Sequence, residues 1–319
     1  MNKTIRFFGA LAAGMAVVTA GILLTKGMLS PEGVVEAAGA GIAEGTEPPE
    51  GIRLLSQLFY TLYYFIPAIA VLVAEREGFG AMLRKYRVGF REIDWRRALT
   101  FVLATALVLP LLHTLCVWAA GNLLHIEQFG RVAIPSGEYD LFGIAMSDNM
   151  LVRGLSIYIR GVAFALLAGL TFNMLFALGG EVGWRGFLGR HLSMSPAKRD
   201  IATGLIWGTW HLPIALIGRV GAMPAIEIVG AVGATYINFV ILSFLLDMAL
   251  ERGRSLFVPA AVYGVYISSS LTSLLDIHSQ APLAGTNSVV GVVSLAILYA
   301  LLRCCYTSRR TISSELPGR

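Results

Sequence analysis

The sequence feature that most constrains the fold is a recurrence of apolar runs of about 20 residues along the whole chain. A run of about this length crosses the hydrocarbon core of a bilayer as a helix. The connections between the runs are short and carry charged residues, Gly or Pro. We therefore predict an all-α, polytopic membrane bundle of about eight transmembrane helices. The expected spans are 5–25, 54–74, 98–120, 157–179, 201–219, 223–249, 256–275 and 286–303.

Composition and loop charges support a multi-pass protein of the cell membrane. The 319 residues are 56% hydrophobic and 14% charged, whereas a soluble domain carries about a quarter charged residues. The connection after the second span is rich in Arg and Lys, and the loops 26–53 and 121–152 are mainly acidic. The positive-inside rule places the basic connection, and with it both termini, in the cytoplasm.

The first apolar run could be read as a secretory signal, because it follows Lys3 and Arg6. It is longer than a typical signal core of about 7–15 residues and has no sharp cleavage site, so we expect it to remain as a membrane anchor. We divide the chain into an N-terminal membrane region, 1–152, and a core with a short basic cytoplasmic tail, 153–319.

The charge and the cysteine content of the chain argue against several classes of function and structure. The net charge of +5 fits basic loops beside anionic lipid, and no basic face or phosphate-binding loop indicates nucleic acid or nucleotide. Cys116 lies inside a span, while Cys304 and Cys305 end the last one. This arrangement gives no disulfide framework.

Ionisable side chains are costly inside a bilayer, so they are the first candidates for a functional site. Glu181 and Arg185 stand four residues apart at the end of the fourth span and would share a helix face. They could form a general base held ionised by its Arg, or a helix-end ion pair at the interface. His211 lies about 15 Å deep in the next span; it could polarise water, bind a metal or bond a neighbouring helix.

Two segments together resemble the CPBP family of intramembrane proteases, which includes CAAX proteases and bacteriocin-processing enzymes. They are Gly-Gly-Glu-Val-Gly-Trp-Arg-Gly at 179–186 and Trp-Gly-Thr-Trp-His-Leu-Pro at 207–213. The stretch from Phe244 to Asp247 and on to Phe257 resembles the lead-in to the third family motif. In that family a first-motif Glu and the second-motif His activate water, and a third-motif His and Asn assist.

This sequence departs from the family pattern at three positions. Gly180 stands at the first Glu, Tyr263 at the third-motif His and Ile267 at the Asn. Glycine offers no proton acceptor and isoleucine cannot donate to an oxyanion, whereas tyrosine can. Because consecutive helical residues point about 100° apart, Glu181 would need a local distortion to replace the missing Glu.

The resemblance implies a set of site residues. We assign catalytic roles to Glu181, Arg185, His211 and Tyr263, and substrate contacts to Trp184 and Trp207. A divalent metal such as zinc could involve His211 and Glu181, although one histidine and one carboxylate are fewer than the three or four protein ligands that zinc normally has.

Three functions remain open. The first is an intramembrane endopeptidase that acts on lipidated or membrane-associated peptides with reduced activity. The second is a noncatalytic relative that binds a membrane peptide or protein partner, in regulation or peptide immunity. A small-solute transporter is the least favoured, because no internal repeat or pair of broken helices is evident. The expected partners are membrane lipid and a peptide or lipidated protein.

Overall fold

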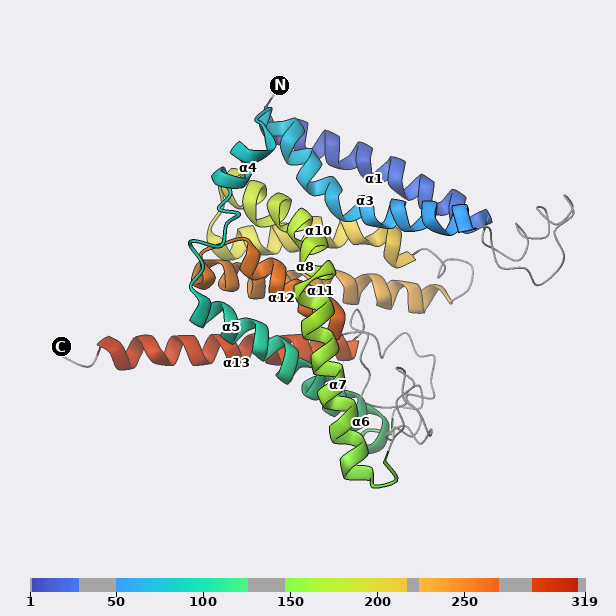
Figure 1. Cartoon of the computed structure of the whole chain (residues 1–319), viewed down its shortest axis with the longest axis vertical. Helices are drawn as coiled ribbons and strands as arrows, with labels where there is room; N and C mark the ends of the chain where they lie inside the picture. Colours follow the sequence, from blue (N-terminus) through green and yellow to red (C-terminus); the bar gives the residue numbers. More distant parts are fainter. Residues whose placement is uncertain (1, 29–49, 126–146, 217–223, 270–288, 315–319) are drawn as a thin grey trace, which may run out of the picture.

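The structure, a computed structural model, describes residues 2–28, 50–125, 147–216, 224–269 and 289–314. Every regular element in these residues is helical (Figure 1). The helices are α1 (Lys3–Met28), α3 (Glu50–Glu75), α4 (Phe79–Lys85), α5 (Trp95–Leu103), α6 (Leu109–Trp118), α7 (Met150–Leu170), α8 (Phe172–Glu181), α9 (Gly189–His191), α10 (Pro196–Leu216), α11 (Ala225–Gly253), α12 (Phe257–Ser269) and α13 (Val289–Ser314). Three π-helical segments interrupt them: η1 (Ala104–Val108), η2 (Ala119–Leu123) and η4 (Val182–Leu188).

The predicted polytopic helical bundle is confirmed, but the number of clear spans differs from the prediction. Six helical segments among the described residues are long and apolar enough to cross a membrane: Lys3–Thr25, Glu50–Glu75, Trp95–Leu123, Met150–Leu170, Ala225–Gly253 and Val289–Tyr306. The expected spans 201–219 and 256–275 correspond to α10 and to α12, whose described part has 13 residues. The count of eight therefore stays a prediction.

The expected fourth span is broken in the middle. Thr171 leaves helical geometry, with φ −111° and ψ −100°, so that α7 and α8 are separate helices. A Cβ on Gly264 of α12 would clash with the Gly169 carbonyl and lie 2.7 Å from the Met174 amide nitrogen. The break thus lies where α12 packs backbone to backbone against the α7–α8 junction.

The first apolar run is a helix integrated into the bundle. α1 lies along α3, and the two helices run side by side in Figure 1. The Phe7 ring stacks on Phe187 with centroids 4.5 Å apart. Lys3 reaches the buried Glu75 carboxylate at the end of α3, at 2.7 Å. These contacts fit a membrane anchor that also packs against the core.

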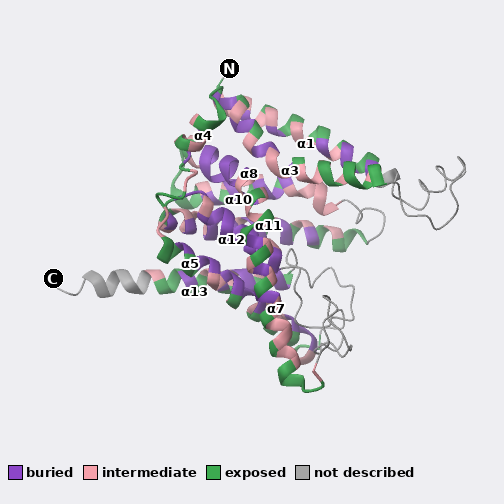
Figure 2. Ribbon diagram, viewed as in Figure 1, coloured by how far each residue is buried: buried purple, intermediate pink, exposed green. Residues whose placement is uncertain are grey.

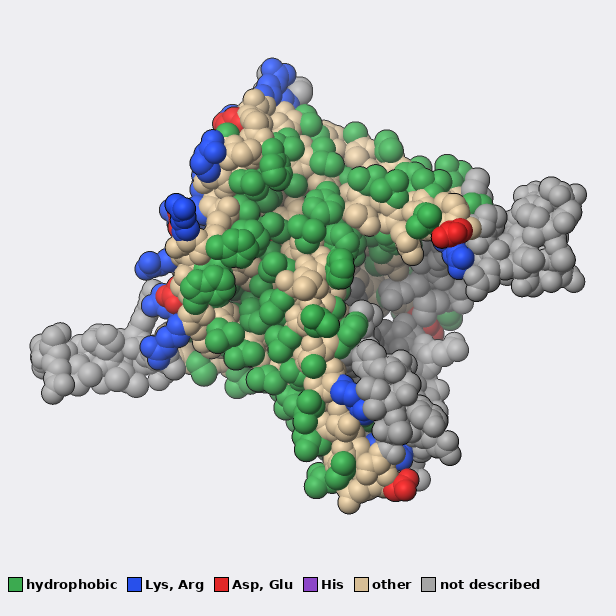
Figure 3. All heavy atoms as spheres, viewed as in Figure 1, with side chains coloured by type: hydrophobic (Ala, Val, Ile, Leu, Met, Phe, Trp, Pro, Cys, Tyr) green, Lys and Arg blue, Asp and Glu red, His purple; other side chains and the backbone are tan. Residues whose placement is uncertain are grey.

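Several helix ends meet at one basic end of the bundle. The Asp94 amide donates to the Gly253 carbonyl at 3.1 Å, which joins the start of α5 to the end of α11. The Arg252 guanidinium lies 5.0 Å from the centre of the Tyr306 ring on α13. Figure 3 shows Lys and Arg side chains along this edge and hydrophobic side chains over the adjoining face. Buried residues gather where α8, α10, α11 and α12 pack together (Figure 2).

Candidate active site

Glu181 and Arg185 form an ion pair inside the protein. Arg185 Nη1 donates to Glu181 Oε1 at 2.9 Å, and the two side chains are 2% and 0% exposed. Arg185 also donates to the Leu242 carbonyl at 3.5 Å, and its guanidinium lies 4.6 Å from the centre of the Trp207 ring. The pair therefore lies in the interior, and neither partner faces the bilayer interface.

The chain winds more widely directly after Glu181. Glu181 is the last residue of α8, and Arg185 lies in the π-helical segment η4. A Cβ on Gly183 would come 2.7 Å from the Pro67 side chain of α3, so this turn needs a glycine for close packing. Single π-helical turns are frequent at functional sites. By its position in the sequence, Glu181 would need a local distortion of the helix to replace the missing Glu. The π-helical segment is such a distortion, but it begins one residue beyond Glu181.

His211 and Tyr263 meet between α10 and α12. The Tyr263 hydroxyl oxygen lies 3.5 Å from His211 Nε2. His211 Nδ1 lies 3.2 Å from the Trp207 carbonyl of the preceding turn. A carbonyl oxygen can only accept, so Nδ1 carries the proton in the neutral ring and Nε2 presents a lone pair toward Tyr263. The imidazole is thereby oriented as a base.

A small cavity of about 10 Å³ lies beside this pair. That volume is about enough for one water molecule. Its described lining comprises Tyr64, Pro67, Phe176, Ala177, Gly180, Trp184, Trp207, Trp210, His211 and Tyr263. The lining includes Gly180 and leaves out Glu181, so no carboxylate among the described residues borders the cavity.

The two predicted substrate-contacting tryptophans both line the cavity. The Trp184 and Trp207 ring centroids lie 6.3 Å apart. Trp207 also packs edge-on against Tyr263, with centroids 4.8 Å apart. Ile267, one turn beyond Tyr263 on α12, is partly buried against the hydrophobic core.

Sequence reasoning missed the contribution of α3. Tyr64 and Pro67 line the cavity. Tyr63 donates to the carbonyl of Trp210, the residue before His211, and stacks on the Trp210 ring with centroids 4.1 Å apart. Two adjacent tyrosines in an otherwise apolar span were the available signal, because a buried tyrosine hydroxyl usually finds a hydrogen-bond partner.

The described residues do not fit a zinc site at this cavity. No three His, Cys, Asp or Glu side chains among them lie close enough together to hold a metal ion. His211 is the one such residue in the described lining, whereas zinc sites use three or four protein ligands. The polar groups that the described lining brings to this cavity include the His211 imidazole and the Tyr263 phenol.

The fold and this cavity define a class of protein: a multi-pass helical membrane protein with a polar site enclosed in its bundle. Residues 162–268 match the family model described as type II CAAX prenyl endopeptidase Rce1-like. The predicted resemblance to the CPBP family is therefore confirmed over this segment, which matches a family model of the intramembrane-protease type. The search of curated proteins found no match.

Proposed function

We propose that this protein binds lipidated or membrane-associated peptides at the cavity between α3, α8, α10 and α12, and hydrolyses them at a much reduced rate. One observation carries the proposal. His211 and Tyr263 converge on a water-sized cavity, while the position that would carry the family carboxylate is Gly180. A base and a hydrogen-bond donor are present, and the carboxylate expected from the family resemblance is missing from the cavity.

The proposed chemistry uses the side chains that border the cavity. His211 Nε2 takes a proton from the confined water as its oxygen attacks a peptide carbonyl, and later returns that proton to the leaving amine. The Tyr263 hydroxyl donates to the developing oxyanion, and Ile267 cannot add a second donor. General base catalysis is typically worth about 10²- to 10⁴-fold, so loss of the carboxylate predicts slow turnover.

A noncatalytic peptide-binding role is the second candidate, and the arrangement of Glu181 favours it. Its Oε1 is engaged by Arg185, and the described cavity lining excludes it. In this role a peptide binds beside the water-sized cavity, against its tryptophans and tyrosines, without cleavage, in regulation or peptide immunity.

The two candidates can be separated with purified full-length protein in liposomes and a panel of prenylated and leader peptides. Slow hydrolysis that is abolished by His211→Ala supports the first candidate. Tight binding of a panel member with no hydrolysis supports the second. Cleavage that survives both His211→Ala and Glu181→Ala contradicts the site itself.

A gain-of-function variant sharpens this test. We expect Gly180→Glu, Tyr263→His and Ile267→Asn together to raise hydrolysis by at least about 100-fold. A Cβ at position 180 would lie 3.1 Å from Trp184 Nε1, so that indole must shift by a few tenths of an ångström. The matched control adds His211→Ala to the triple variant and should remove the gain.

The proposed topology places the basic end of the bundle, with both termini, on the cytoplasmic side of the cell membrane. Within the proposed division, region 1–152 contributes α3 to the cavity wall, and region 153–319 carries the residues of the family motifs. We propose that the N-terminal region acts as a scaffold for the site.

A further inference from the structure

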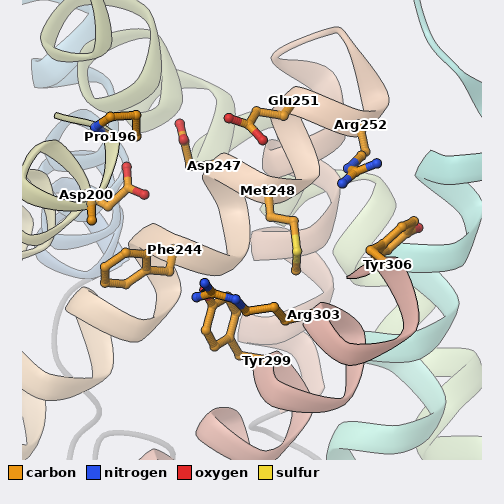
Figure 4. Close-up of a pocket in the computed structure, with 11 residues that line it drawn as sticks. Pro196, Asp200, Phe244, Asp247, Met248, Glu251, Arg252, Tyr299, Arg303 and Tyr306 are labelled. Carbon is orange, nitrogen blue, oxygen red and sulfur yellow. The ribbon is translucent and has the colours of Figure 1, made fainter. Parts of the chain in front are cut away.

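A second, larger pocket opens at the basic end of the bundle, between α10, α11 and α13. Its volume is about 300 Å³, and it shares no described lining residue with the cavity beside His211. Figure 4 shows carboxylates on one side of this pocket, from α10 and α11, and an arginine and two tyrosines approaching from α13. The described lining is Pro196, Ala197, Asp200, Phe244, Asp247, Met248, Glu251, Arg252, Tyr299, Arg303 and Tyr306.

Three carboxylates form the acidic side: Asp200, Asp247 and Glu251. Arg199 Nη2 lies 3.1 Å from Asp247 Oδ2, and Arg199 Nε lies 4.0 Å from Asp200 Oδ1. The Arg199 guanidinium therefore lies close to two of the three carboxylates. Glu251 is exposed and forms no ion pair with a described residue. The acidic side can therefore accept hydrogen bonds from a cationic group.

The opposite side joins arginines to aromatic rings. Arg303 donates to the Tyr299 hydroxyl at 2.9 Å, and its guanidinium lies 5.9 Å from the centre of that ring. Arg252 lies 5.0 Å from the centre of the Tyr306 ring. A guanidinium held against a ring keeps a defined orientation and can still bind a phosphate through several N–H groups.

The place of the pocket in the membrane identifies the kind of ligand. Arg303 and Tyr306 lie in the last turns of a candidate membrane span that ends at Tyr306, and Asp247 and Glu251 lie in the last turns of the span that ends at Gly253. The ends of a span lie at headgroup level. Phe244 and Met248 add an apolar part to the lining.

We propose that this pocket binds the headgroup of a zwitterionic phospholipid that carries a primary amine, as in phosphatidylethanolamine. The phosphate lies against Arg303 and Arg252, and the ammonium group donates to Glu251 and Asp247. The exposed Glu251 carboxylate in the lining disfavours a purely anionic headgroup beside it, since like charges repel.

A primary ammonium fits this pocket better than a quaternary one. It has three N–H donors for carboxylates, whereas a choline group has none and is recognised by aromatic faces. The faces of Tyr299 and Tyr306 are engaged by Arg303 and Arg252. These two rings therefore already contact arginines and do not form a free aromatic cage for a choline group. The carboxylates of the pocket can accept hydrogen bonds from a primary ammonium.

Native mass spectrometry of the delipidated full-length protein in detergent tests the proposal. Dioleoyl lipids are titrated with phosphatidylethanolamine, its N-methyl and N,N-dimethyl derivatives, phosphatidylcholine and phosphatidylglycerol as headgroups. We expect affinity to fall with each N-methyl group, to about one tenth for phosphatidylcholine. Equal affinity across the methyl series, or tighter binding of phosphatidylglycerol than of phosphatidylethanolamine, would overturn the proposal.

Two variants connect the binding to the pocket. Glu251→Gln should remove most of the preference for the primary amine, and Arg303→Gln should weaken all the phospholipids several-fold without changing their order. Both residues are exposed, so neither variant should unfold the protein. Arg91→Gln and Glu92→Gln make the same charge changes at exposed sites outside the described lining and should have no effect. An unchanged preference in Glu251→Gln contradicts the assignment.

Discussion

The Tyr263 hydroxyl oxygen lies 3.5 Å from Nε2 of His211, although 52 positions separate the two residues in the sequence. The contact joins α10 to α12 beside a cavity that can hold about one water. Tyr263 stands where the family resemblance predicts a histidine. Its phenol preserves a hydrogen-bond donor and supplies no second imidazole.

Replacing this tyrosine tests its proposed role as a donor. Tyr263→Phe should slow residual peptide hydrolysis by about 100-fold, as expected for the loss of one oxyanion donor, and should change peptide affinity little. Turnover and binding are measured separately in liposomes. Tyr266→Phe is the matched control, because its hydroxyl donates to Asn238 at 3.0 Å and does not line the cavity. Equal losses in both variants would argue against a special role for Tyr263.

The buried Glu181–Arg185 pair should behave as a unit. Arg185→Met leaves the Glu181 carboxylate buried without its cation and should cost about 3–5 kcal/mol of stability. Adding Glu181→Met should recover most of that loss, since replacing both partners of a buried pair is often neutral. Denaturant unfolding in detergent measures both variants. Additive losses in the double variant would show that the ion pair is not coupled.

The contact between α12 and the α7–α8 junction should tolerate no side chain. Gly264→Ala would place a Cβ against the Gly169 carbonyl and 2.7 Å from the Met174 amide nitrogen. We expect a loss of about 1–3 kcal/mol, as for other overpacked sites, visible as a lower melting temperature. Gly233→Ala is the control: it is exposed on α11, with nothing near the added Cβ, and should stabilise slightly.

Asp200 should make stability depend on pH. It precedes the expected span 201–219, and burial, followed by the nearby Asp247 carboxylate, raises its pKa to about 7. An unfolded aspartate titrates near about 4, so the folded state binds more protons and stability should fall between about pH 4 and pH 7. Asp200→Asn should match wild type below about pH 4 and exceed it at pH 8. Melting curves that differ equally at both pH values would contradict this assignment.

The proposed topology can be tested by thiol labelling. Cys304 and Cys305 are exposed at the end of the last span, and Cys116 is half-buried. A membrane-impermeant maleimide should label intact cells poorly and inside-out vesicles strongly. Cys304→Ser with Cys305→Ser should remove that signal. Strong labelling of intact cells would place the basic end outside.

Much of the fold followed from hydropathy because crossing a bilayer imposes a length on each apolar run. Hydropathy gives no information on breaks within a run. Thr171 ends α7 inside the expected fourth span because α12 packs backbone to backbone there, at Gly169 and Gly264. That contact is tertiary, so a pattern along one segment could not show it.

Part of the candidate site could be predicted from the sequence. Spacing predicted the Glu181–Arg185 pair, because residues four apart share a helix face. It did not predict that Gly180 lines the cavity beside His211 without Glu181. Side-chain direction around the π-helical turn depends on packing against α3, and α3 lies more than a hundred residues away in the chain.

The α3 wall of the cavity limits how this protein can be divided or recombined. Tyr63, Tyr64 and Pro67 all lie outside the segment matched by the family model, 162–268. A chimera that transplants only this segment onto another membrane scaffold would lose the hydrogen bond that Tyr63 donates next to His211. The smallest exchangeable unit is therefore discontinuous in the sequence, and it must include the second span together with the motif-bearing helices.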